Sequence, residues 1–207
     1  MHFEDHTRPA HEAREVADAH RTLLEHLRAA PNARKSAPSA LRGWTIGHVV
    51  AHLAQSADSH VELLSGRPQY EGGAPGRATR IDAGADRPWA ELLADAERAF
   101  AAVEAAYAGV ESWSTPVSML AGPVSAGYLP LIRRREIEVH RLDLRLGATV
   151  DQIDRSYLAR DLGFLEAWLT ARSGEIPAPI LELDATDRWL WMVGRLDVRG
   201  VEPAGLF

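Results

Sequence analysis

Glu136 and His140 stand four residues apart in a segment with helical periodicity, which places their side chains one above the other on one helix face. One helix can then offer two ligands to a single metal ion, as zinc-protease helices do. Asp143 follows three residues after His140 on that face. Its carboxylate can accept a hydrogen bond from the imidazole nitrogen that a metal leaves free. These residues predict a metal centre in which Asp143 orients His140.

The face that carries these groups is predicted to be buried, because Leu129 and Ile132 lie on the same arc of the helix. A buried carboxylate without a partner is costly, so something must compensate for the charge of Glu136. The plainer alternative to a metal is a buried ion pair, either with one of the three preceding arginines at positions 133, 134 and 135 or with an arginine of another helix.

Three histidines in the segment 45–64 are candidates for a further ligand. His48 and His52 are four residues apart, and His60 lies two turns beyond His52. On a helical wheel His60 lies nearer the centre of the apolar stripe than His52, so periodicity alone favours His60 as the more buried residue. His60 also fits an ordinary core histidine, and His48 fits a solvated first turn. Spacing therefore leaves this ligand open.

Composition bounds the class of protein. The chain has 207 residues, 46% of them hydrophobic, enough for one good core, and a net charge of −6, which argues against nucleic acid and anionic membranes as partners. It has no cysteine, so a reaction that needs a thiol must take it from outside. The start of the chain is too polar for a signal peptide, and no apolar run approaches the roughly 20 residues that span a bilayer. We expect a soluble, cytoplasmic protein.

The elements that must position these groups are mainly helical. Hydrophobic periodicity predicts five helices, over about 9–29, 45–64, 88–107, 128–146 and 154–172. Between them we expect two long connections, at 66–88 and 109–127. After residue 174 apolar residues alternate with polar ones, which predicts short strands. The expected domains are a helical metal-binding bundle over 1–174 and a β-rich extension over 175–207.

Three stretches resemble a known family. They are Gly43–Leu53, with the sequence GWTIGHVVAHL, Arg135–Leu144, with REIEVHRLDL, and Ile81–Pro88, which is followed by Glu91 and Leu92. In this order, with helical spacing between them, they resemble the mycothiol-dependent maleylpyruvate isomerase N-terminal domain family of the DinB-like superfamily. The resemblance spans roughly residues 10–175. It implies an up-down four-helix bundle, here with an additional helix and a short C-terminal β appendage.

The resemblance also implies a metal site. The family's histidine before leucine maps to His52, and its second motif maps to Glu136 and His140. Three protein ligands leave one position open, as in catalytic zinc sites. Zinc is the expected metal, and Ni²⁺ or Fe²⁺ also suit two histidines and a carboxylate.

One departure from the family concerns the C-terminal lobe. In the isomerase the helical domain is followed by a larger α/β lobe that contributes an arginine to the reaction, whereas here about 30 residues follow residue 177. We therefore expect a lobe that is reduced or that stops early. None of Arg188, Arg195 and Arg199 can be matched to the family's arginine.

The resemblance implies a metal-dependent enzyme that uses mycothiol or a similar low-molecular-weight thiol, acting on a small electrophilic substrate as a cis–trans isomerase or a thiol S-transferase. Arg77 and Arg80 are candidates to bind an anionic substrate or the thiol, against the plainer expectation of solvated loop arginines. No catalytic residue is assigned. As partners we expect the substrate and the thiol; a homodimer is one expectation for the oligomeric state.

Two rival functions remain open at this point. A metal-assisted hydrolase would need a general base, for which Asp143 is the one candidate. A non-catalytic DinB-like metal-binding protein would close the site with a fourth protein ligand, for which His48 is the candidate.

Overall fold

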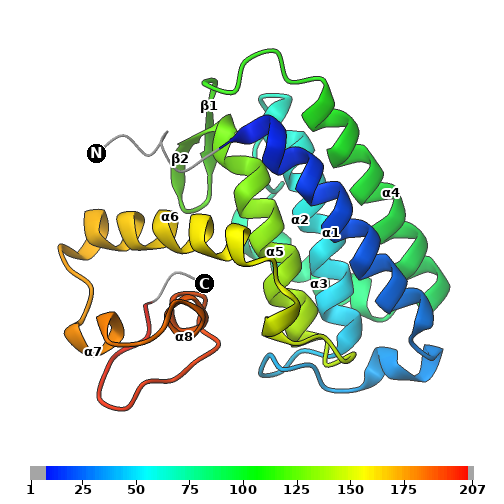
Figure 1. Cartoon of the computed structure of the whole chain (residues 1–207). Helices are drawn as coiled ribbons and strands as arrows, with labels where there is room; N and C mark the ends of the chain where they lie inside the picture. Colours follow the sequence, from blue (N-terminus) through cyan, green and yellow to red (C-terminus); the bar gives the residue numbers. More distant parts are fainter. Residues whose placement is uncertain (1–7, 205–207) are drawn as a thin grey trace. The chain divides into compact units, whose positions relative to one another are not determined.

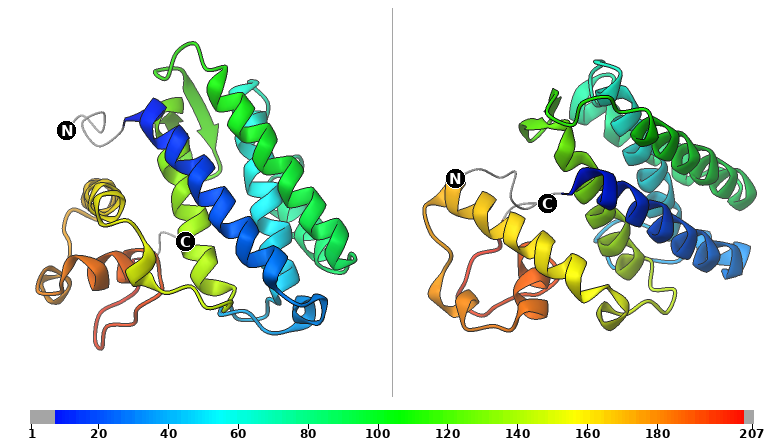
Figure 2. Two further views of the ribbon diagram at one scale, coloured as in Figure 1. Left: turned by 45° about the vertical axis from the view of Figure 1, so that its right-hand side comes forward. Right: turned by 45° about the horizontal axis from the view of Figure 1, so that its top comes forward.

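Four long helices form the core of the first of two compact units in the computed structural model, which describes residues 8–204 (Figure 1). This unit covers residues 8–148, and the second begins at residue 149. The four helices are α1 (Pro9–Ala29), α2 (Ile46–Leu64), α4 (Trp89–Ala108) and α5 (Leu129–Asp143). They lie side by side in all views (Figures 1 and 2), and the predicted DinB-like helical bundle is confirmed.

The ends of the helices follow from local sequence. Pro9 stands at the start of α1, where its missing N–H costs nothing. Thr45 caps α2: its hydroxyl accepts from the backbone N–H of His48, and the His48 ring accepts from the backbone N–H of Thr45. The 3-10 helix η2 (Asn32–Ser36) joins α1 to this cap. The cap fixes the N-terminal turns of α2, from which His52 projects.

The connection predicted over 66–88 contains a helix that the sequence reading missed. Helix α3 (Gly73–Ala85) packs against α2, and its glycines, which weaken helical periodicity as a signal, allow this approach. A Cβ on Gly84 would lie 2.9 Å from the Cβ of Ala51, so only glycine permits this contact.

Helix α3 also determines the direction in which α4 runs relative to α2. It returns the chain to the start of α2, where Ala85 lies against Gly47, so that α4 then runs parallel to α2. Arg98 of α4 accordingly reaches Asp58 of α2, and both residues lie near the middle of their helices. The expectation of simple up-down alternation is therefore wrong for the pair α2 and α4, because α3 occupies the intervening antiparallel step.

The second long connection, expected over 109–127, contains the two strands of the first unit. Strands β1 (Pro116–Met119) and β2 (Gly122–Ser125) form an antiparallel hairpin in which Val117 faces Val124. The 3-10 helix η3 (Ala126–Tyr128) then leads directly into α5. The hairpin thus delivers the chain to the helix that carries Glu136 and His140.

Within residues 149–204 the regular elements of the second unit are all helical, so the predicted C-terminal strands are wrong. It contains η4 (Val150–Gln152), α6 (Arg155–Ser173), α7 (Ala178–Leu181) and α8 (Ala185–Met192). The side chain of Asp184 accepts from the backbone N–H groups of Thr186 and Asp187 and so starts α8. Trp189, Met192 and Val193 are then buried at helical spacing.

This unit packs α6 against α8, and the Trp189 indole donates to Asp161 at 2.8 Å. Because α6 belongs to this unit, the boundary between the two units precedes α6, whereas the sequence placed a domain boundary after residue 174. Within residues 8–204, no helix combines the length and the apolar character needed to cross a bilayer.

Candidate metal centre

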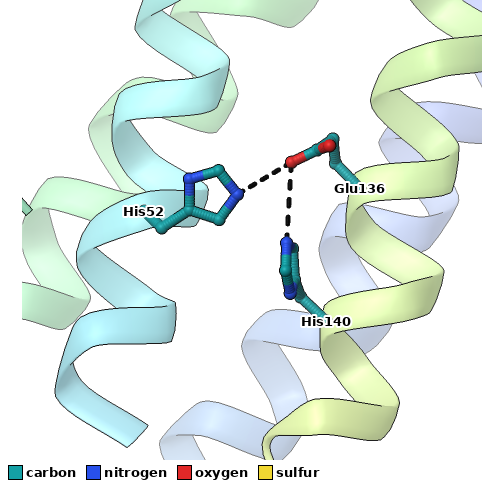
Figure 3. A group of neighbouring side chains, drawn as sticks. All are labelled: His52, Glu136 and His140. Carbon is teal, nitrogen blue, oxygen red and sulfur yellow. Dashed lines mark hydrogen bonds and ion pairs between the residues drawn. The ribbon is translucent and has the colours of Figure 1, made fainter. Parts of the chain in front are cut away.

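The structure brings His52, Glu136 and His140 together across the interface of α2 and α5 (Figure 3). Nε2 of His52 lies 2.8 Å from Oε2 of Glu136, and Nε2 of His140 lies 3.7 Å from the same oxygen. One nitrogen or oxygen of each residue lies within 4.8 Å of the other two. Both histidines are buried, and the Glu136 side chain is 18% exposed.

Asp143 lies where the spacing of α5 predicted. Its Oδ2 is 2.8 Å from Nδ1 of His140, and its side chain is 1% exposed. The carboxylate fixes the ring orientation by accepting the Nδ1 hydrogen, which turns Nε2 towards Glu136. The group that orients His140 is thus supplied three residues further along the same helix.

Two further side chains border His52. Trp44 precedes α2 in the sequence, and the centroid of its ring lies 5.6 Å from the centroid of the His52 imidazole. On the other side, Nη2 of Arg77 in α3 lies 3.0 Å from Nδ1 of His52. Because arginine has no acceptor, Nδ1 accepts this hydrogen bond and the ring hydrogen is on Nε2, from which His52 donates to Glu136.

The electrostatics of the cluster keep a negative charge on Glu136. Burial alone would raise its pKa, but hydrogen bonds with His140 and His52 outweigh burial and hold the pKa well below its usual range. Burial lowers the pKa of His52 to about 4, with His140 and Arg77 acting in the same direction and the bond to Glu136 opposing them. For His140, the hydrogen bonds to Asp143 and Glu136 outweigh burial and raise the pKa.

This donor set fits a divalent cation. Two imidazole nitrogens and a carboxylate oxygen converge on one point, and these are atoms that bind zinc and similar metals. A metal would compete with the hydrogens that now join the three residues, so we expect its affinity to fall with falling pH. It would also need the unprotonated Nε2 of His52, which requires the ring hydrogen to move to Nδ1, where Arg77 now donates.

The other residues singled out from the sequence lie elsewhere. Among the described residues no fourth protein ligand joins the cluster. His48 lies outside it, with Nδ1 in the cap of α2. His60 is buried and hydrogen-bonded to Tyr107 at 2.6 Å, as an ordinary core histidine would be. Arg80 binds the carbonyl of Glu71 on the surface of α3.

The plainer reading of Glu136 as the partner of a neighbouring arginine is not what the structure shows. The ionic contacts of Glu136 are with the two histidines, while Arg134 pairs with Glu15 at 2.8 Å. All three arginines of the run 133–135 are nevertheless buried. Sequence reasoning treated them only as partners of Glu136 and so missed Arg133, which lies two turns before His140 on the same helix face.

Comparison with known proteins places this geometry in context. The family model described as "Mycothiol maleylpyruvate isomerase N-terminal domain" matches residues 16–145, which contain all three cluster residues. A comparison with curated proteins found no match.

Two solved structures share the fold over nearly the whole chain. They are the mycothiol-dependent maleylpyruvate isomerase and a variant of it with a histidine-to-alanine substitution, each with a TM-score of 0.80 at 21% identity. Each match covers 94% of this chain and 92% of the other. Because the match covers most of the other chain, it gives no support to the expectation of a C-terminal lobe that is reduced or stops early.

Proposed function

The chain belongs to the mycothiol maleylpyruvate isomerase N-terminal domain family, and from this premise we propose that it is a metal- and thiol-dependent isomerase. Its substrate would be a small electrophilic, carboxylate-bearing molecule, and its cosubstrate mycothiol or a similar thiol. The observation that carries this proposal is the cluster of His52, Glu136 and His140, with three protein ligands and no fourth among the described residues. Catalytic zinc sites have this arrangement, whereas structural sites use four protein ligands.

A divalent metal held by these three residues would supply the charge that keeps a thiol deprotonated at neutral pH. Asp143 holds the His140 ring in place through Nδ1, and Trp44 walls the site beside His52. Because Asp143 is committed to His140, it is poorly placed to act as a free general base, which counts against metal-assisted hydrolysis.

The thiol has to come from a cosubstrate, since the chain has no cysteine. In the proposed reaction a thiolate adds to the activated double bond of the substrate, forming a carbon–sulfur bond and leaving an enolate. Rotation about the resulting single bond, followed by expulsion of the thiolate, gives the trans product and regenerates the thiol. If the adduct is instead protonated and released, the reaction is an S-transfer.

The metal is tested by elemental mass spectrometry on the purified chain. We expect one equivalent of a divalent metal in the wild type and loss of that metal in His52→Ala and Glu136→Ala. His48→Ala is the matched control, since His48 lies one turn before His52 on α2 and outside the cluster. Metal loss in His48→Ala as well would favour a closed, non-catalytic site.

The reaction is tested by incubating the metal-loaded chain with maleylpyruvate and mycothiol and following both by NMR. Conversion to the trans isomer without net consumption of thiol supports the proposal. Stoichiometric loss of thiol with a stable adduct would assign an S-transferase. Cleavage of the substrate into hydrolysis products without any need for thiol would assign a hydrolase and overturn the proposed function.

A further inference from the structure

A second group of polar side chains lies inside the first unit, one helical turn along α5 from Glu136. Arg133 stands three residues before Glu136 and is fully buried, with 0% of its surface exposed. Its Nε donates to Nε2 of His20 at 3.1 Å, and Nδ1 of His20 lies 2.7 Å from Oε1 of Glu104. The guanidinium also lies over the Phe100 ring, 5.0 Å from its centroid. These contacts fix one edge and one face of Arg133.

The opposite edge of the guanidinium is unused. Within the part of the chain that the structure describes, neither Nη1 nor Nη2 of Arg133 has a hydrogen-bond partner, and both atoms are buried. Burial lowers the pKa of Arg133 to about 10, so the side chain remains a cation at neutral pH. A buried cation with two free donors is costly until an acceptor satisfies them. The edge formed by the two Nη atoms matches a carboxylate, which accepts two parallel hydrogen bonds.

We propose that Arg133 anchors an internal anion site, in which Nη1 and Nη2 bind a carboxylate group of the small-molecule substrate. That the bound anion is the substrate rests on the proposed function. That Arg133 binds an anion rests on the contacts of Arg133 alone. The assignment replaces Arg77 and Arg80 as carboxylate receptors. Arg77 already donates to His52, and Arg80 binds Glu71 at the surface.

A pocket of about 470 Å³ is lined by residues of α2, of the connection that follows it and of α3, and Arg133 itself is not among them. Asp58 and Tyr70 line it, and both are close enough to Arg133 to raise its pKa against the larger effect of burial. Because each of the three carboxylates that line the pocket is paired with an arginine, the lining opposes an incoming anion only weakly. These pairs are Asp58 with Arg98, Glu62 with Arg67 and Glu71 with Arg80.

The position of Arg133 suits a substrate that also reaches the metal cluster. One turn of helix rises about 5.4 Å. If one carboxylate of a small acid binds to Arg133, the remainder of that molecule would therefore lie beside Glu136 and His52. The surrounding rings fix the Nε edge of Arg133: His20, which accepts from Nε, stacks on Phe100 with centroids 4.1 Å apart.

The test is a titration of the metal-free chain with maleate, a small dicarboxylate, by isothermal calorimetry, with the side-chain nitrogen resonances of Arg133 followed by NMR. Using metal-free protein separates the anion site from the metal and from any turnover. We expect maleate to bind, to shift the Nη resonances of Arg133, and to bind at least about tenfold more weakly to Arg133→Met. The neutral diamide of maleate should not compete.

Two further variants keep the test decisive. Arg133→Lys retains the buried charge and should therefore fold even if Arg133→Met does not. Because lysine lacks the planar guanidinium, this variant should also bind maleate about tenfold more weakly than the wild type. Arg80→Met is the matched control and should bind as the wild type does. No binding to metal-free wild type, unchanged binding in Arg133→Lys, or an equal loss in Arg80→Met would overturn the anion site. Failure of the isomerase assay with Arg133-dependent binding intact would overturn only the proposed function.

Discussion

Two polar clusters lie inside the same helical unit, one turn apart along α5, and they differ in what they leave unsatisfied. In the cluster of His52, Glu136 and His140, two imidazole nitrogens and a carboxylate oxygen lie within 4.8 Å of one another, and all three atoms become acceptors once the hydrogens between them are lost. Around Arg133, the Nε edge is bonded to His20 while two Nη donors have no partner within residues 8–204. An excess of acceptors suits a cation, and an excess of donors suits an anion. Burial alone therefore does not identify a ligand; the balance of donors and acceptors does.

The largest expected effect concerns the cluster of acceptors. Glu136→Ala removes the one negative ligand and should weaken binding of a divalent metal by at least about a hundredfold, because two neutral imidazoles remain. Competition with a chromophoric chelator measures this affinity. Arg133→Lys serves as the control from the neighbouring cluster and should leave the metal affinity within a few-fold. An equal loss in both variants would mean that the two clusters form one site.

The residues around Arg133 should determine how the stability of the metal-free chain depends on pH. Burial lowers the pKa of His20 from 6.5 to about 4, so between these values the unfolded chain binds a proton that the folded chain does not. The stability that neutral His20 provides is present above pH 6.5. It is lost as pH falls towards 4, by about 3 kcal/mol in total.

This pH dependence can be measured by urea unfolding between pH 4 and 7.5 in the wild type and in His20→Gln. Glutamine can accept from Arg133 and donate to Glu104 but does not titrate, so the slope of unfolding free energy against pH should be smaller in the variant. At pH 7.5 the two proteins should differ only by the constant cost of the substitution. Equal slopes would show that His20 is not held neutral in the fold.

A smaller effect is expected from the residue that orients His140. Asp143→Asn keeps the side-chain shape but weakens the hold on Nδ1, and should lower metal affinity about 10- to 100-fold. The same chelator competition measures the loss, which should be smaller than that of Glu136→Ala. A loss as large as that of Glu136→Ala would make Asp143 a ligand in its own right.

The smallest effect has the opposite sign. Arg77 donates to Nδ1 of His52 and so favours the ring form whose Nε2 carries the hydrogen that a metal must replace. Arg77→Ala should therefore raise metal affinity, by up to about tenfold, since a positive charge beside a ligand is also removed. Arg80→Ala, one turn further along α3 and bonded to Glu71, should change nothing. Unchanged or lower metal affinity in Arg77→Ala would show that the hydrogen bond from Arg77 to His52 does not oppose metal binding.

Part of the fold and of the candidate site could be predicted from the sequence. The long helices were predicted within a few residues, because their apolar stripes and caps, such as Thr45 before α2, are local signals. The spacing of Glu136, His140 and Asp143 was likewise enough to place them on one face of α5. Resemblance to a family, and not periodicity, selected His52 over His60 as their partner.

Other features are decided by tertiary structure. The helical wheel favours His60 as the more buried histidine, yet both His52 and His60 are buried. The reason is that α2 packs against α3, α4 and α5, which leaves little of its surface exposed near His52. Helix α3 was hidden by its glycines, which make the close approach to Ala51 possible. The alternating apolar residues near Trp189 were read as strands, whereas the cap at Asp184 starts a helix there.

Residue type and the fixed helical repeat were enough to single out Glu136, His140 and Asp143 as candidates for a site and to place them on one helix. Only the tertiary structure decided which partners they meet. It placed His52 against Glu136, Arg77 against His52, and Arg133 in the core with one edge free. Contacts between helices depend on how long-range packing buries each surface, and the period of a single helix does not contain that information.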